Sequence, residues 1–194
     1  MNKLDKEFWN QRWRNGETGW DIGYASPAIV DYFDKIEDKE INILIPGCGN
    51  AYEAEALRER GFKNIRILDI SDEAVAQLKK KYKDRDEIKV IHQDFFDHQG
   101  QYDYIIEQTF FCALNPNLRQ DHAEKMHELL RPKGVLVGLM FNKNFDSDGP
   151  PFGGNKEKYH PIFEPYFNFI QFDETNKSIP PRLGSEIFIE LQKK

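Results

Sequence analysis

A glycine-rich turn after an apolar segment is the first feature of the sequence that points to chemistry. Residues 41–46 read INILIP and lead into Gly47, Cys48 and Gly49. A strand that runs into such a turn and then into a helix presents bare backbone at the carboxyl end of a sheet, where open α/β sheets bind ligands. A dinucleotide pyrophosphate site requires a third glycine three positions after Gly49, and that position holds Tyr52. The turn therefore indicates a ligand site but disfavours a nicotinamide-dependent dehydrogenase.

Acidic residues follow the next three predicted strands. Asp69 lies about twenty residues after the glycines, where an acid hydrogen-bonds ribose hydroxyls. Asp94 is placed to accept the adenine amino hydrogens, with a neighbouring aromatic ring flanking the base. Glu107 suits a positively charged ligand, because a cation is buried at lower cost beside a carboxylate than alone; the alternative is an ordinary surface acid. A ribose, an adenine and a positive centre together indicate S-adenosylmethionine.

The elements that must position these residues alternate along the chain. Strands are predicted over 41–46, 64–70, 88–92, 102–107, 135–141, 167–173 and 185–191, and helices over 51–60, from a cap at Ser71 to about residue 82, and over 119–130. This alternation predicts an α/β fold, a parallel sheet with helices on both faces. A turn is expected at Pro132, Lys133 and Gly134. We expect one domain over 1–194, with an N-terminal helical cap over 1–36 and a lid loop over 142–160.

Composition and charge exclude several classes of protein. The 194 residues are 39% hydrophobic and include 15 Phe, so disorder is not expected. The net charge is −6 with no dense basic cluster, which disfavours nucleic acid as a partner. We expect no membrane partner, because apolar runs are short, and a cytoplasmic location, because no signal peptide is encoded. Cys48 and Cys112 lack metal-ligand spacing, so no metal is expected. We further expect a small-molecule substrate and a monomer or weak dimer.

In chain order the sequence contains the motifs FWNQRWRNGETGW, IPGCGN, LDIS, QDFF, FFCALNPNLRQDHAEKMHELLRPKG, GPPFGG and IPPRLGSE. Together these motifs resemble the thiopurine S-methyltransferase family of class I, S-adenosylmethionine-dependent methyltransferases. Within that family the chain is most similar to the plant-type thiol, thiocyanate and halide methyltransferases. The resemblance covers nearly the whole chain. It implies a doubly wound, Rossmann-like sheet of seven mostly parallel strands with an antiparallel last strand.

The resemblance also implies where the ligands bind. The cofactor S-adenosyl-L-methionine, which leaves as S-adenosyl-L-homocysteine, is expected at Trp9, Trp13, Trp20, Gly47, Cys48, Gly49, Asp69, Ile70, Asp94, Phe95, Phe96, Glu107 and Gln108. Candidate substrate contacts are Trp20, Phe111, Phe152, Tyr159 and Arg182. The tryptophans have an alternative role as packing for an N-terminal helix, Tyr159 as a surface residue, and Arg182 as the partner of a surface acid. At Gln108 the chain departs from the family, because the thiopurine enzymes carry Arg there and the plant enzymes carry Tyr.

The expected reaction is the in-line transfer of an activated methyl group. An anionic nucleophile needs no base, so the protein contributes alignment and exclusion of water. Cys112 has no base placed for it and is interpreted as a buried side chain, and His122 is interpreted as structural. The preferred function is methylation of a thiol, hydrosulfide, thiocyanate or halide. The alternatives are methylation of an aryl or heterocyclic thiol and S-adenosylmethionine binding without catalysis.

Overall fold

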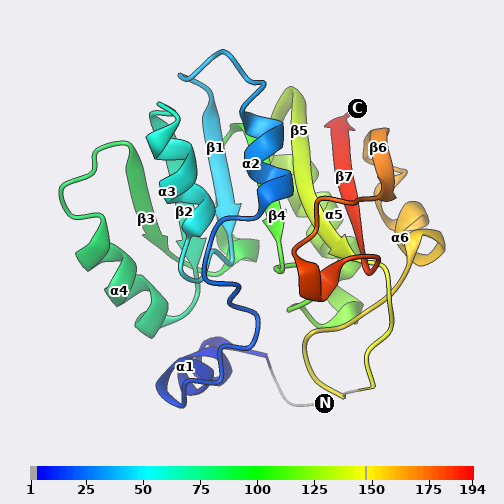
Figure 1. The fold of residues 1–194 in the computed structure, drawn as a ribbon, viewed down its shortest axis with the longest axis horizontal. Helices are drawn as coiled ribbons and strands as arrows, with labels where there is room; N and C mark the ends of the chain where they lie inside the picture. The colour runs from blue at the N-terminus through cyan, green and yellow to red at the C-terminus, as the bar shows by residue number, and fades with distance from the viewer. Residues whose placement is uncertain (1–3, 147) are drawn as a thin grey trace.

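A seven-stranded sheet forms the centre of the computed structural model, which describes residues 4–146 and 148–194 (Figure 1). The strand order is β3-β2-β1-β4-β5-β7-β6. The strands are β1 Asn42–Pro46, β2 Asn64–Asp69, β3 Ile88–His92, β4 Tyr102–Gln108, β5 Leu130–Phe141, β6 Phe167–Glu174 and β7 Glu186–Lys193. Strands β1 to β5 pair in parallel, whereas β7 runs antiparallel to both β5 and β6. The predicted sheet, with its antiparallel last strand, is confirmed.

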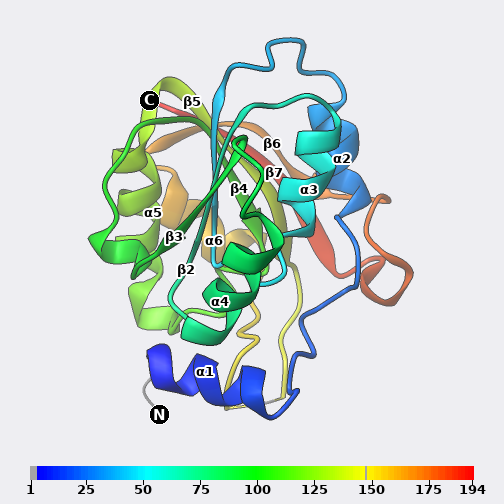
Figure 2. The same ribbon diagram turned by 90° about the vertical axis from the view of Figure 1, so that its left-hand side faces the viewer.

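Helices cover both faces of this sheet, as the alternating pattern predicts (Figure 2). They are α1 Lys6–Arg14, α2 Pro27–Phe33, α3 Tyr52–Glu59, α4 Asp72–Lys81, α5 Arg119–Leu129 and α6 Lys156–Phe163, with short 3-10 turns η1 Phe95–Asp97, η2 Pro116–Leu118 and η3 Pro180–Arg182. Successive strand side chains point to opposite faces, so Ile43 and Ile45 pack toward α2, α3 and α4, while Leu44 packs toward α5 and α6. Burial on both faces explains why β1 is apolar from Ile43 to Pro46. No helix of the described part of the chain is long and apolar enough to cross a membrane.

The start of β5 differs from the prediction. A turn was expected at Pro132, but β5 begins at Leu130, which pairs with Tyr102 of β4. The pairing shifts register before Tyr104, and Lys133 adopts a positive φ of 65°. Such an irregularity accommodates a proline that donates no ladder hydrogen bond. Residues 132–134 therefore form an irregular part of β5 and not a separate turn.

The loop after β5 is shorter than expected. It was predicted over 142–160, but α6 begins at Lys156. Asn155 caps this helix, because its side chain accepts a hydrogen bond from the Lys158 amide at 3.0 Å. Tyr159 therefore lies on a helix and not in the loop. Ser147, within the expected loop, lies outside the described residues.

Helix α1 lies across the carboxyl ends of the parallel strands, apart from both helical layers (Figures 1 and 2). Asn10 attaches it to the start of α4 and is only 1% exposed. Its amide nitrogen donates to Asp72 Oδ2 at 2.8 Å, and its amide oxygen accepts from Ser71 Oγ and from the Asp72 amide, both at 2.8 Å. Ser71 caps α4 as predicted, since its Oγ accepts from the Ala74 amide. One buried asparagine therefore joins α1 to the α4 cap.

We predict that Asn10→Ala loosens α1. The substitution leaves buried hydrogen-bonding groups on α4 unsatisfied, which costs about 1–3 kcal/mol. Hydrogen exchange of the α1 amides is expected to accelerate more than exchange of the central strands. Gln11→Ala is the control, because Gln11 is exposed and its side chain donates to Glu7 Oε1 at 3.4 Å, on the same helix. Equal α1 exchange in the two variants would contradict the assigned role of Asn10.

Candidate functional site

The glycine turn after β1 is shaped by close approach of neighbouring groups. Gly47 and Gly49 have positive φ values of 56° and 52°, the left-handed region that favours glycine. A Cβ on Gly47 would lie 2.3 Å from Cδ2 of Phe110, so a larger residue does not fit. The Cys48 amide donates to the Leu68 carbonyl at 3.1 Å. The turn is thus fitted between the end of β2 and the segment that follows β4.

Asp69 is buried at the end of β2, directly beside this turn. Its carboxylate is 8% exposed and accepts two backbone amides, from Gly49 at 3.0 Å and from Ser71 at 2.9 Å. Burial raises the pKa of Asp69, and the amide hydrogen bonds oppose that shift. Each carboxylate oxygen retains a further lone pair as an acceptor. Asp69 therefore lies where the sequence predicted a ribose-binding acid, with Ile70 following it.

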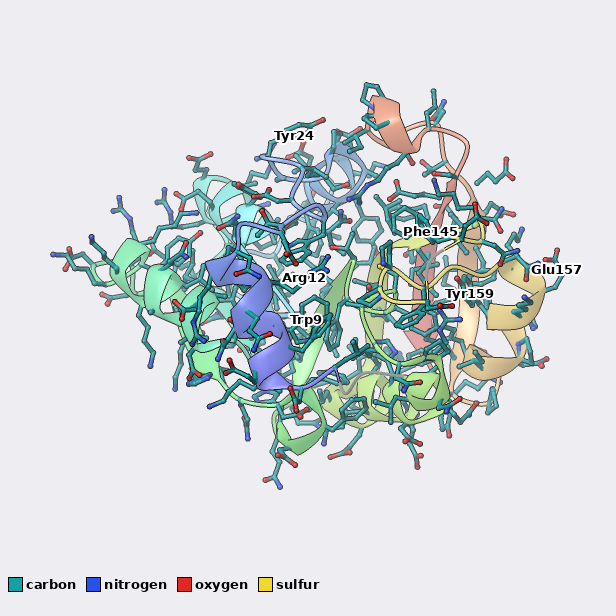
Figure 3. The ribbon with its side chains drawn as sticks, turned by 90° about the horizontal axis from the view of Figure 1, so that it is seen from below. Trp9, Arg12, Tyr24, Phe145, Glu157 and Tyr159 are labelled. Atoms are coloured by element: carbon teal, nitrogen blue, oxygen red, sulfur yellow. The ribbon has the colours of Figure 1, made fainter. Side chains whose placement is uncertain are left out.

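Three indole rings gather over the glycine turn. The rings of Trp9 and Trp13 each meet Trp20 edge to face, with centroids 5.6 and 5.9 Å apart. A Cβ placed on Gly49 would lie 3.7 Å from Nε1 of Trp20 and 3.9 Å from Cζ2 of Trp13. Figure 3 shows Trp9 directed from α1 toward the middle of the molecule. Phe145 of the 142–155 loop lies across the middle of this view from α1. We call Trp9, Trp13 and Trp20 the indole cluster; all three are partly exposed.

The segment after β3 places one acid and two aromatic rings near the same edge. Asp94 caps η1, since its Oδ1 accepts from the Phe96 amide at 2.9 Å. Phe95 is buried, with its ring 5.1 Å from that of Phe110 and 5.6 Å from that of His122. Phe96 is partly exposed. Asp94 and Phe96 thus lie just after the carboxyl end of β3, whereas the Phe95 ring packs into the core.

Glu107 and Gln108 end β4 beside the glycine turn. Glu107 is 1% exposed, so its interpretation as a surface acid is wrong. Its Oε1 accepts the amides of Phe110 at 2.9 Å and Phe111 at 2.8 Å, which folds the chain back toward Gly47. The Gln108 Oε1 is buried, and no described residue donates a hydrogen bond to it. This oxygen is a polar group available to a ligand.

Arg182 approaches the indole cluster from the opposite end of the chain. Its Nη2 donates to the Trp20 carbonyl at 3.1 Å, and its guanidinium carbon lies 5.2 Å from the centre of the Phe141 ring. Its Nη1 lies 3.4 Å from Glu186 Oε1. Glu186 is buried, so the pairing expected with a surface acid is instead an ion pair with a buried one. Arg182 therefore lies at the expected substrate end of the site.

Arg119, which the sequence analysis did not single out, holds the 142–155 loop. Its Nη2 donates to the carbonyls of Phe152 at 3.1 Å and Gly153 at 3.0 Å. The Phe152 amide in turn donates to the Cys112 carbonyl at 2.7 Å. The one local signal was a basic residue in the first turn of a helix, where the helix dipole disfavours a cation. The guanidinium also lies 4.7 Å from the Phe111 ring centre, which accounts for its burial.

Two predicted substrate residues lie behind the site. Phe111 and Tyr159 are fully buried and meet edge to face at 5.2 Å. The Tyr159 hydroxyl donates to the Phe141 carbonyl at 3.0 Å, so its interpretation as a surface residue is wrong. Tyr159 thus contacts the last residue of β5, and Phe111 packs against Arg119, which holds the 142–155 loop. Over residues 4–146 and 148–194, no group of three or more His, Cys, Asp or Glu side chains is placed to hold a metal ion.

Comparison with known proteins identifies the family. Residues 4–188 match the family described as "Thiopurine S-methyltransferase (TPMT)". The chain belongs to this family. It is 32% identical to a protein of Arabidopsis thaliana named "Probable thiol methyltransferase 2", a match that covers 96% of this chain and 84% of the relative. It is 30% identical to "Thiocyanate methyltransferase 1" of Brassica oleracea, over 94% of this chain and 83% of that protein.

The fold is also similar to that of a methyltransferase of known structure. The crystal structure of Burkholderia thailandensis 1,6-didemethyltoxoflavin-N1-methyltransferase, with 1,6-didemethyltoxoflavin and S-adenosylhomocysteine bound, superposes with a TM-score of 0.75. The match covers 97% of this chain and 87% of that one at 15% sequence identity. The resemblance seen in the sequence, the fold class and the expectation of a methyltransferase are confirmed.

We predict that neither cysteine of this methyltransferase reacts readily in the native state. Burial raises the pKa of the Cys112 thiol to about 12 and raises that of Cys48 well above its ordinary value. Thiolate, the reactive form, is therefore scarce at neutral pH. Iodoacetamide is expected to alkylate the folded protein at least about a hundredfold more slowly than the protein unfolded in guanidinium. Rapid modification of native Cys112 that abolishes activity would instead favour a nucleophilic role.

Proposed function

We propose that this enzyme transfers a methyl group from S-adenosylmethionine to a small, soft, anionic sulfur or halide nucleophile. The observation that carries the proposal is the indole cluster over Gly49, with buried Asp69 on the other side of the same turn. An indole face attracts a cation, and a sulfonium is a cation whose methyl group is already activated. We therefore assign the indole cluster to the sulfonium group of the methyl donor.

The residues at the carboxyl edge of the sheet fit such a donor. Gly47 and Gly49 supply close backbone approach for the methionyl part, and Asp69 supplies acceptors for the ribose. Asp94 and Phe96 border the position proposed for adenine. The unpartnered Gln108 Oε1 supplies an acceptor for the methionyl ammonium group. When bound, the donor contributes the activated methyl group, and these residues orient it and exclude water.

The acceptor side is basic and aromatic. Arg119 and Arg182 are both largely buried there, and only Arg182 has a carboxylate partner among the described residues. The Glu107 Oε1 already accepts two amides, and its Oε2 is buried 3.6 Å from Nε2 of His122. The Tyr159 hydroxyl already donates to a carbonyl, so neither side chain is placed as a general base. A nucleophile that arrives as an anion needs no base and is stabilised by positive potential. This environment therefore favours a thiolate, hydrosulfide, thiocyanate or iodide.

The relatives support the same choice, because those named for thiol and thiocyanate methylation share 30–32% identity with this chain. Methylation of an aryl or heterocyclic thiol is the second candidate. The ring of Phe145, which is partly exposed in the loop and lies 4.9 Å from that of Phe141, favours it by offering a surface for stacking. A panel of acceptors separates the two candidates.

We predict that the donor binds and that binding requires Asp69. Calorimetric titration with S-adenosylmethionine and S-adenosylhomocysteine is expected to saturate for the wild type. Asp69→Asn, which keeps the side-chain shape but removes the charge, is expected to weaken both affinities at least tenfold, since hydrogen bonds to a charged group contribute about 1.5–3 kcal/mol. Asp84→Asn is the matched control, because Asp84 is exposed and distant in the chain from the glycine turn. No binding by the wild type would refute the proposed cofactor.

We predict that Arg182 selects the anionic acceptor. Arg182→Gln keeps one amide donor in place of the guanidinium, which contacts the Trp20 carbonyl and Glu186, and it removes the positive charge. The KM for thiocyanate, iodide or hydrosulfide is expected to rise about tenfold, with a smaller change in kcat. Arg60→Gln, which alters an exposed pair with Asp34, is the control. Turnover of an aryl thiol alone would favour the second candidate, and donor binding without any turnover would indicate a binding protein.

A further inference from the structure

A buried histidine with no ordinary partner lies beneath the site. His122 of α5 is fully enclosed, and neither ring nitrogen has a hydrogen-bond partner among the described residues. Its ring is surrounded by aromatic rings, with centroid distances of 5.2 Å to Phe111, 5.6 Å to Phe95 and 5.7 Å to Phe110. A neutral imidazole carries one N–H donor and one acceptor, and it is costly to bury both unpaired. A purely apolar role would be better filled by phenylalanine.

A polar group, Oε2 of Glu107, faces this ring. Oε1 of Glu107 accepts the Phe110 and Phe111 amides, whereas Oε2 has no hydrogen-bond donor in the described part of the chain. Oε2 lies 3.6 Å from Nε2 of His122. That separation suits an ion pair and is a few tenths of an ångström beyond a hydrogen bond. Each group supplies what the other lacks, since a buried carboxylate requires a donor or a positive partner.

We propose that His122 is a positioning residue that keeps a proton between its Nε2 and Glu107 Oε2. The proton satisfies Oε2 and fixes the carboxylate in the orientation in which Oε1 accepts the amides of Phe110 and Phe111. No covalent bond changes in this role. The pair thus stabilises the turn over residues 109–112, whose first residue, Thr109, has a positive φ of 59°.

This turn touches both halves of the proposed active site. The Phe110 ring fills the space beside Gly47, which is assigned to the donor. The Cys112 carbonyl accepts the Phe152 amide and so holds the loop assigned to the acceptor. A shift of the turn would therefore move the two reactants relative to each other, and transfer is sensitive to small misplacement. The functional part of this inference rests on the proposed function, whereas the pairing of His122 with Glu107 does not.

Two substitutions separate positioning from packing. His122→Phe keeps an aromatic ring and removes both nitrogens, while His122→Gln keeps an amide donor that reaches Glu107 Oε2. We expect His122→Phe to weaken S-adenosylmethionine affinity about tenfold and to lower kcat more than it changes the acceptor KM. His122→Gln is expected to restore both to within about threefold of the wild type. Equal impairment in the two variants, or no impairment in His122→Phe, would overturn the positioning role.

The pairing itself is tested without activity. Long-range proton–nitrogen NMR spectra of the five histidines report which ring nitrogen carries a proton. We expect His122 to be protonated at Nε2 and its signals to shift in Glu107→Gln. An unshifted signal would refute the pair even if the enzyme methylates every acceptor tested. Conversely, a shifted signal in a protein that binds no donor would refute the proposed function and leave the pair intact.

His98 supplies the matched control for losing a buried histidine. His98 is also buried, but its ring nitrogens contact Tyr102 Oη at 2.8 Å and Gln93 Oε1 at 3.0 Å. It lies at the opposite end of β4 from Glu107, because Tyr102 is the first residue of that strand. His98→Phe is expected to lower thermal stability and to leave donor affinity unchanged. If it weakened the donor as much as His122→Phe does, the effect would be general destabilisation, and the positioning role would be wrong.

Discussion

The hydrogen bond from the Gly49 amide to the Asp69 carboxylate, 3.0 Å long, joins the ends of β1 and β2. The bond forms because the turn adopts left-handed backbone conformations, and at Gly47 any side chain would collide with Phe110. Once the turn is fixed, its outer surface faces the indole cluster and its inner surface faces the segment after β4. The rest of the site is arranged around this contact.

The three acids at or after the strand ends, Asp69, Asp94 and Glu107, accept hydrogen bonds from backbone amides of the protein itself. Asp69 accepts the amide of Ser71, Asp94 that of Phe96, and Glu107 those of Phe110 and Phe111. Each carboxylate therefore folds the turn that follows its own strand. A site whose polar groups are already held in place needs little reorganisation when charge is transferred across it.

Local sequence signals account for most of the fold and for part of the site. The Ser71 cap and the apolar strand that leads to Gly47 are encoded within a few residues of the structures they form. The burial of Glu107 was not predictable in this way, because it depends on packing by α5, and neither was the loop contact of Arg119, which joins residues 33 and 34 positions apart. Tyr159 was misread for a similar reason, since its enclosure depends on contacts with Phe111 and Phe141, which are distant in the chain. Local patterns predict elements and strand ends, whereas enclosure is decided by distant segments.

The position of β7 has a consequence for how the chain is made. This strand lies between β5 and β6, and in the described structure β6 pairs with no other strand. During synthesis, residues 167–174 must therefore wait for residues 186–193 to leave the ribosome before they join the sheet. Arg182, just ahead of β7, contacts the Trp20 carbonyl 162 positions earlier in the chain. The contact between Arg182 and Trp20 therefore forms only after residue 182 has emerged, much later than the glycine turn of residues 47–49 is synthesised.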